Sequence, residues 1–185
     1  MGLSFISIRF NRGFTLIEVM VVVAIIGILA SVLFASFEEG RQQSRDKFRQ
    51  SELKELQLAI ELYKAQNGSY PAAGCGQIAL HWSGPGPHPS WGMDCQDYIT
   101  GLVPDYIGSL PRDPKSEDVN GVGFIYSTNS DQSGYKLLSH QAAESLFVTS
   151  YTDEFARCPS ACGVCGAIGL QSNVYAVYSN GADCW

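Results

Sequence analysis

The sequence predicts an α+β fold in which one long N-terminal helix packs on a small antiparallel sheet whose loops are stapled by disulfides. Three observations lead to this. The chain has no charge from Val19 to Phe37 and no proline between Phe14 and Tyr70. Short alternating apolar segments separated by turn residues follow in the C-terminal half. All six cysteines lie after the helical segment. A helix followed by a run of strands is an order of elements typical of α+β proteins.

Residues 1–13 form a short basic leader with two arginines and no acid. An ordinary secretory signal places its apolar core before the cleavage site, but here the basic segment precedes the apolar run. A cut after Gly13 would therefore leave that run on the mature chain. The arginines would keep this end in the cytoplasm and place the chain after Phe37 across the membrane. An uncut signal anchor is the alternative.

Residues 14–37 are predicted to be the half of the helix that spans the membrane or fills a fibre core. The run is long enough to cross a hydrocarbon layer. Glu18 is its one charged residue. A carboxylate near the lipid core costs roughly 2–3 kcal/mol or more on insertion scales, so Glu18 should have a partner.

Residues 38–67 are predicted to be the amphipathic half of the same helix. Apolar residues recur there at spacings of three and four, with Glu and Lys between them, which predicts one buried stripe. The stripe consists of Leu53, Leu56, Ile60 and Tyr63. Asn67-Gly68, followed closely by Pro71, predicts the end of the helix.

Residues 68–185 are predicted to form a globular head of strands and loops. The segments GVGFIYST and GYKLLSH, separated by residues 129–133, indicate a hairpin, and NVYAVYSN indicates a further strand. Residues 72–98, rich in Gly, Pro and aromatics, read as a long structured loop. Trp82 and Trp91 are expected to form a small apolar cluster in it, or else a binding platform for a sugar or a surface.

The six cysteines are predicted to form disulfides in the head, because an exported domain with a small core needs such staples. They are Cys75, Cys95, Cys158, Cys162, Cys165 and Cys184. Sequence does not choose among the 15 possible connectivities. A Cys75–Cys95 pair, which would close the Gly/Pro loop, is preferred.

Two other roles for the cysteines stay open. Cys162-x-x-Cys165 resembles half a zinc site or a redox motif. A zinc knuckle needs a second ligand pair, which Cys184 alone does not supply, and His81, His88 and His140 have no metal-ligand spacing. Disulfides are therefore favoured over zinc.

The charge distribution argues against nucleic-acid binding. After Asn67 the chain has eleven acidic and four basic residues, whereas a nucleic-acid surface must be basic. No nucleophile elbow, phosphate-binding glycine loop or HExxH motif occurs, so no catalytic residues are expected.

Gly13-Phe14-Thr15-Leu16-Ile17-Glu18, followed by the apolar run, resembles the processing motif of type IV pilins and type II secretion pseudopilins. This resemblance implies a pilin-like fold and cleavage after Gly13 by a prepilin peptidase, with N-methylation of Phe14. It also implies self-assembly into a helical filament on an inner-membrane assembly platform. The chain would be a single-pass inner-membrane protein with an extracytoplasmic head before it enters a surface pilus or a periplasmic pseudopilus.

The resemblance gives Glu18 a partner. After cleavage, the Phe14 amine and Glu18 would be the fixed charges of the apolar segment, and opposite charges attract strongly in low dielectric. Glu18 is expected to pair with the Phe14 amine of an adjacent subunit and so to set the axial register. Pairing within the same chain, snorkelling to headgroups, and simple stabilisation at the helix N-terminus are the alternatives.

A second stretch, Leu-Pro-x-Asp-Pro at residues 110–114 followed by a tyrosine-containing strand, is similar to the major pseudopilin of type II secretion. That family binds calcium in a later acidic loop, which is missing or remodelled here, and Lys115 stands where the family has tryptophan. No cofactor is expected, with calcium as a weak possibility at an oxygen-rich turn. The candidate ligands are Asp113, Glu117, Asp118 and Asn120. A solvated turn is the favoured alternative.

Three functions follow from these features. The chain is expected to be a structural subunit of a type IV pilus or a type II secretion pseudopilus, and the sequence does not separate the two. An alternative is a signal-anchored extracytoplasmic binding module whose site is the aromatic Gly/Pro loop. A third is a disulfide oxidoreductase that uses Cys162 and Cys165.

Overall fold

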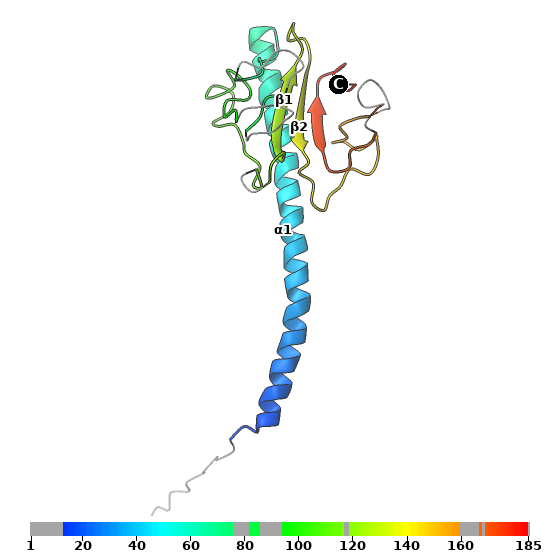
Figure 1. Cartoon of the computed structure of the whole chain (residues 1–185). Helices are drawn as coiled ribbons and strands as arrows, with labels where there is room; N and C mark the ends of the chain where they lie inside the picture. The colour runs from blue at the N-terminus through cyan, green and yellow to red at the C-terminus, as the bar shows by residue number, and fades with distance from the viewer. Residues whose placement is uncertain are drawn as a thin grey trace, which may run out of the picture. The chain divides into compact units, whose positions relative to one another are not determined.

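The computed structural model describes residues 13–75, 82–85, 94–116, 119–159, 167 and 169–184. Its elements are α1 (Leu16–Asn67), β1 (Gly123–Thr128), β2 (Tyr135–His140) and β3 (Tyr175–Tyr178), as Figure 1 shows. This order confirms the expected α+β, pilin-like fold. The chain divides into two compact units, Met1–Gly40 and Arg41–Trp185, with the division inside α1.

Interactions between neighbouring residues determine where α1 begins and where it ends. At its start, Thr15 and Glu18 exchange hydrogen bonds across the first turn. At its end, Gly68 adopts a φ of 85° and donates its N–H to the Lys64 carbonyl at 2.8 Å. This left-handed conformation is one that glycine adopts without strain, so Gly68 ends the helix as expected.

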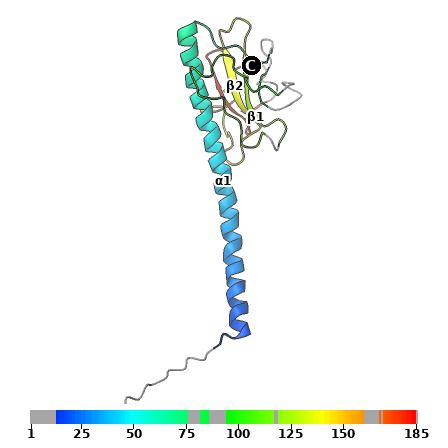
Figure 2. The ribbon, with the colours of Figure 1, turned by 90° about the vertical axis from the view of Figure 1, so that its left-hand side faces the viewer.

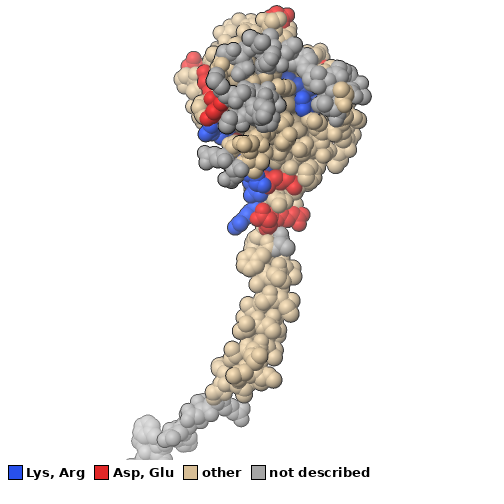
Figure 3. Space-filling view, in the orientation of Figure 1, with Lys and Arg blue, Asp and Glu red and all other residues tan. Residues whose placement is uncertain are grey.

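In the first unit, α1 is apolar on every side. Among the described residues it is the one helix long and apolar enough to cross a membrane, judged by length and composition. From Val19 to Phe37 it has no charged residue, and the face drawn in Figure 3 shows this stretch without red or blue atoms. A helix that is apolar on every side needs an apolar environment around its side chains.

In the second unit, three antiparallel strands form a sheet in the order β1-β2-β3. The hairpin pairs Gly123 with His140 and Thr128 with Tyr135, and β3 pairs with β2 from Lys136–Tyr178 to Ser139–Tyr175. The expected hairpin and third strand are therefore confirmed. Figures 1 and 2 show the sheet lying against the C-terminal half of α1.

The main core lies between α1 and one face of the sheet. The expected stripe on α1 is confirmed, because Leu53, Leu56 and Ile60 are fully buried and Tyr63 packs against them. Strand residues that alternate along the chain meet this stripe, as the period of two requires. They are Phe124, Tyr126, Tyr135, Leu137, Tyr175 and Val177.

The opposite face of the sheet holds a smaller core. Ile125, Leu138 and Ala176 are cross-strand neighbours there, and Trp82 packs on them. The sheet is thus covered on both faces, and for that reason most of its side chains are buried.

Candidate functional site

Gly13 and Phe14, the expected processing pair, are exposed and precede α1. A Cβ added at Gly13 would meet no atom within 4 Å, and Gly13 does not have a positive φ. The fold of the described chain therefore places no demand for glycine at position 13. A requirement for glycine there would have to come from another molecule.

Glu18 and Thr15 form a reciprocal cap on the helix. The Thr15 N–H and hydroxyl donate to Glu18 Oε2 at 2.9 and 2.8 Å, and the Glu18 N–H donates to Thr15 Oγ1 at 3.3 Å. This is the geometry of a capping box, in which two N–H groups without helical partners are satisfied at once. In the single chain, Glu18 therefore has a local partner, which matches the helix N-terminus alternative.

The apolar segment that follows Glu18 is uncovered in its own unit. Phe14 is 87 % exposed, and every large apolar side chain described from Leu16 to Phe37 is more than half exposed. They are Leu16, Ile17, Val19, Met20, Val21, Val22, Val23, Ile25, Ile26, Ile28, Leu29, Val32, Leu33, Phe34 and Phe37. A surface of this kind in water is far larger than a soluble monomer carries, so lipid or other chains must cover it.

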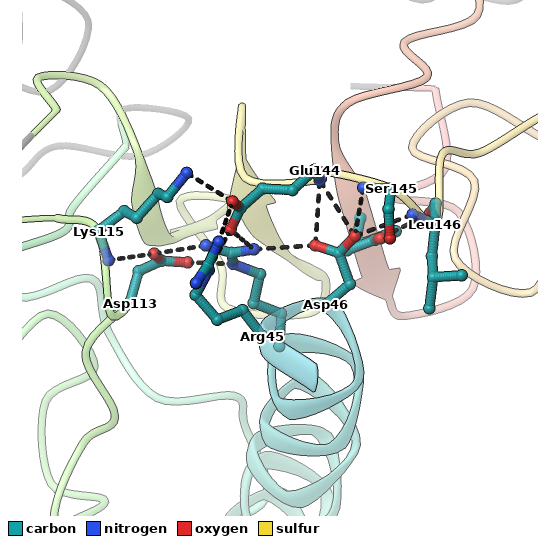
Figure 4. Close-up of polar contacts among 9 residues, drawn as sticks. Arg45, Asp46, Asp113, Lys115, Glu144, Ser145 and Leu146 are labelled. Carbon is teal, nitrogen blue, oxygen red and sulfur yellow. Dashed lines mark hydrogen bonds and ion pairs between the residues drawn. The ribbon is translucent and has the colours of Figure 1, made fainter. Parts of the chain in front are cut away.

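A second polar site lies inside the head, where Arg49 is fully buried. Its Nε and Nη2 donate to the two carboxylate oxygens of Asp113 at 2.7 and 3.0 Å. Its Nη1 donates to Asp46 at 2.8 Å and to Glu144 at 2.8 Å. Figure 4 shows its three carboxylate partners converging: Asp46 from α1, Asp113 from the loop before β1 and Glu144 from the loop after β2.

Glu144 collects the remaining cations of this cluster. Arg45 binds it with two hydrogen bonds of 2.7 and 2.6 Å, and the Lys115 ammonium lies 2.5 Å from Oε2. With Arg49, three cations thus face three carboxylates. We call this group the ionic cluster; its members are Arg45, Asp46, Arg49, Asp113, Lys115 and Glu144.

Asp46 also fixes the backbone of the loop after β2. It accepts the N–H groups of Glu144, Ser145 and Leu146 at 2.8–3.1 Å. These hydrogen bonds attach the loop to α1.

The pKa values of Glu144 and Arg49 are both shifted toward the charged form. The hydrogen bonds from Arg45 are the main cause that lowers the pKa of Glu144, and those from Lys115 and Arg49 add to it, against the opposing effect of burial. For Arg49, burial disfavours the charge, but the hydrogen bonds to Asp113 and Glu144 outweigh it and raise the pKa. Both shifts favour charge-assisted hydrogen bonds between Arg49 and Glu144, which join α1 to the loop after β2.

Sequence reasoning missed this cluster, although a signal was present. Continuing the stripe Leu53-Leu56-Ile60 backwards by helical spacing leads to Arg49 and Asp46. A charged residue in a core stripe must have buried partners, so these two positions indicated an internal ion pair.

The structure gives Asp113, one of the calcium candidates, a different role. Both of its carboxylate oxygens are engaged by Arg49, and Oδ1 also accepts the Lys115 N–H at 2.8 Å. Asn120 is exposed, and Glu117 and Asp118 lie outside the described residues. No group of three potential metal ligands occurs in the described part of the chain. Calcium binding stays a prediction, and a calcium ion at Asp113 would have to compete with the Arg49 guanidinium.

The preferred disulfide is present. Cys75 and Cys95 are bonded across a sequence separation of 20, which closes the Gly/Pro loop. Cys158 and Cys184 are also disulfide-bonded, so neither is a free thiol. Cys162 and Cys165, on which the zinc and redox hypotheses depend, lie outside the described residues.

The aromatic loop is described in part. Trp82 packs on the smaller core of the sheet, in agreement with a packing role. Trp91, His81 and His88 lie outside the described residues. The Nδ1 atom of His140 is 2.7 Å from the Gly121 carbonyl, so this histidine has a structural partner.

Comparison with known proteins agrees with this anatomy. Residues 8–34 match the family described as the prokaryotic N-terminal methylation motif. The type II secretion system core protein G of Vibrio cholerae is 34 % identical over 112 residues, which cover 60 % of this chain and 70 % of that protein. The protein of the same name from Klebsiella pneumoniae is 36 % identical over 108 residues, or 58 % of this chain and 71 % of that protein.

A more extended match is to the Escherichia coli K12 protein of the same name, at 29 % identity over 129 residues, which cover 70 % of this chain and 80 % of the relative. No solved structure matches the chain. The N-terminal motif, the long apolar helix on a three-stranded sheet and these identities together lead to one conclusion: the chain belongs to the type II secretion system core protein G family, the major pseudopilins.

Proposed function

We propose that this chain is a structural subunit of a type II secretion pseudopilus, made as a precursor, cleaved after Gly13, methylated on Phe14 and assembled into a helical filament. The observation that carries the proposal is the apolar half of α1, in which every large side chain from Leu16 to Phe37 is uncovered. Lipid covers such a surface before assembly, and neighbouring helices cover it afterwards.

The processing step is supported by Gly13. Since the described fold does not need glycine there, the residue is explained by a peptidase that reads it. Residues 1–13 then form the leader, residues 14–37 the membrane and fibre-core segment, residues 38–67 the amphipathic half of α1, and residues 68–185 the extracytoplasmic head. The bonded Cys75–Cys95 pair suits an oxidising compartment for that head.

Glu18 changes its partner in this scheme. In the single chain its carboxylate caps the helix through Thr15. In the filament the Phe14 amine of an adjacent subunit is its counter-charge, because a cation entering the apolar bundle alone would be strongly disfavoured. The cap keeps the carboxylate hydrogen-bonded until that amine arrives.

The partners are further copies of the chain, the prepilin peptidase and an inner-membrane assembly platform. The role is structural. The ionic cluster serves the fold rather than a reaction, since its members saturate one another and one backbone loop.

Deletion of the gene from its host tests this function. We expect loss of type II secretion, measured as exoprotein activity in the medium, with surface pili unchanged under the electron microscope. Intact-mass analysis of the wild-type chain should show a mature protein that begins at Phe14 and carries one N-methyl group. Loss of surface pili with normal secretion would assign the chain to a type IV pilus instead, and a chain that keeps its leader would contradict the processing step.

A further inference from the structure

The ionic cluster joins three segments of the head through charges that the chain itself supplies. Its members come from α1, from the loop before β1 and from the loop after β2, as Figure 4 shows. Three carboxylates converge there, and carboxylates that converge in a protein interior must be neutralised by a bound metal ion or by basic side chains. Which of the two neutralises them decides whether the head depends on a free ion.

Arg49 occupies the point at which the three carboxylates meet. Its Nε, Nη1 and Nη2 atoms all lie within 3.0 Å of carboxylate oxygens, which belong to Asp46, Asp113 and Glu144. Neither the Arg49 nor the Asp113 side chain is accessible to solvent. Carboxylate oxygens gathered around one positive centre are also the surroundings that Ca²⁺ prefers in proteins. Here a guanidinium fills that centre.

Lys115 supplies a further cation at the edge of the cluster. Its ammonium lies 2.5 Å from Glu144 Oε2 and its N–H donates to Asp113 at 2.8 Å, so it joins the two loops. This lysine stands where the major pseudopilins have tryptophan. The loop after β2 departs from those proteins as well, since Glu144 is the one acid in residues 141–152. A calcium site takes about six to eight oxygen ligands, including carboxylates, which this loop does not supply.

We propose that the cations of the ionic cluster, Arg45, Arg49 and Lys115, take the place of the calcium ion that the resemblance to the major pseudopilins implies, so that the head holds its loops without a divalent cation. Asp46 completes this arrangement, because it binds three N–H groups of the loop after β2 directly from α1. The inference concerns the head alone. It does not depend on the kind of filament, so its failure would leave the proposed function untouched.

A cation that belongs to a side chain differs from a bound ion in one measurable respect. A bound ion stabilises the folded state by an amount that rises with its free concentration, whereas a side chain contributes the same at every concentration. The stability of the wild-type head should therefore be independent of calcium and of chelators.

Thermal unfolding of the mature full-length chain in detergent tests this, in EDTA and in millimolar calcium chloride at matched ionic strength. Wild type should unfold at the same temperature in both, within about 1 °C. For comparison, a calcium concentration about a hundredfold above the dissociation constant of a site would raise the Tm by about 5–10 °C. A decrease of that size when EDTA is added to wild type would overturn the proposal.

Two variants remove a side-chain cation and leave the carboxylates in place. Arg49→Met empties the centre of the cluster. Lys115→Glu, at a side chain that is 39 % exposed, replaces the ammonium beside Glu144 by a carboxylate. Each variant should unfold at a lower temperature than wild type in EDTA, and calcium should raise its Tm by about 5 °C, since a site for a cation has been vacated.

Lys54→Glu is the matched control. It makes the same charge reversal beside Glu154, in a pair whose side chains are both more than half exposed, and it should not respond to calcium. Lys115→Glu keeps Arg49 and changes a partly exposed position, so it carries the test if Arg49→Met does not fold. A calcium response confined to the cluster variants supports the proposal. No response in either, or an equal response in Lys54→Glu, would overturn it.

Discussion

Arg49 and Asp113, which are 64 residues apart in the chain, form a two-point ion pair in which neither side chain is accessible to solvent. The pair joins α1 to the loop that leads into β1. Because Asp46 on the same helix holds the loop after β2, the ionic cluster fastens both loops that flank the hairpin to a single turn of α1.

Removal of Arg49 should be strongly destabilising. Arg49→Met leaves Asp113 without its cation and should lower the free energy of unfolding by about 3–5 kcal/mol. The double variant Arg49→Met/Asp113→Leu removes both charges and should be more stable than the single variant. Urea unfolding of the full chain in detergent, followed by near-ultraviolet circular dichroism, measures both. Equal stability of Arg49→Met and wild type would contradict a locking role.

Acid should weaken the head through Glu144. Its pKa is lowered in the folded state, so its contribution to stability is fully present above the unfolded pKa of about 4.3 and is lost as the pH falls toward the folded pKa. The free energy of unfolding of wild type should therefore fall below about pH 4. Glu144→Gln should be less stable at pH 7, and its profile should be flatter in that acidic range. If the free energy of unfolding depended on pH in the same way in wild type and Glu144→Gln, protonation of Glu144 would not be coupled to stability.

Loss of the Cys75–Cys95 bond should destabilise the head by about 3 kcal/mol, because the unfolded chain regains the freedom of a loop of some twenty residues. Cys75→Ser/Cys95→Ser removes the pair without leaving a single thiol. Thermal unfolding under non-reducing conditions measures the change, and far-ultraviolet circular dichroism at the same temperature should show that α1 persists. A variant as stable as wild type would assign the bond no energetic role.

Two substitutions distinguish the capping hydrogen bonds at the start of α1 from the charge of Glu18. Thr15→Ala removes the hydroxyl that accepts from the Glu18 N–H and should cost about 1 kcal/mol, seen as roughly fivefold faster amide exchange in the first turn. Glu18→Gln keeps a side chain that can complete a capping box but removes the charge, so its amide exchange should stay near wild type. Fast exchange in Glu18→Gln would show that the cap itself needs the carboxylate.

Assembly should respond to the charge rather than to the cap. Glu18→Leu should insert in the membrane and be processed, since it is more apolar, yet the Phe14 amine would lack a counter-charge and filament yield should collapse. Glu18→Gln should assemble as poorly as Glu18→Leu if charge sets the register. Exoprotein activity in the medium at equal membrane levels of the variants decides the matter, and normal secretion with Glu18→Leu would refute the pairing.

Processing should depend on the size of residue 13. Gly13→Val should keep its leader, because a peptidase pocket shaped for glycine excludes a branched side chain, while the described part of the chain has no atom within 4 Å of a Cβ at this position. Intact mass of the membrane-extracted protein measures this. A correctly cleaved Gly13→Val chain would show that glycine is not what the peptidase reads.

The sequence by itself determined the elements whose causes are local. An uninterrupted apolar run with Thr15 and Glu18 at its start and Asn67-Gly68 at its end specifies one long helix, and alternation specifies β1, β2 and β3. The Gly13-to-Glu18 motif likewise identified the family. Helical and strand periods are properties of neighbouring residues, and for this reason they are readable from sequence.

Only the tertiary structure decided which distant groups meet. Asp113 looked like an acid in a solvated turn, but the fold places it against buried Arg49, and Glu144 was one acid among many until three cations surrounded it. The sequence favoured Cys95 as the partner of Cys75, and the structure confirms that preference. Ion pairs across 64 to 100 residues depend on how the loops close around the core, and no local pattern encodes that geometry.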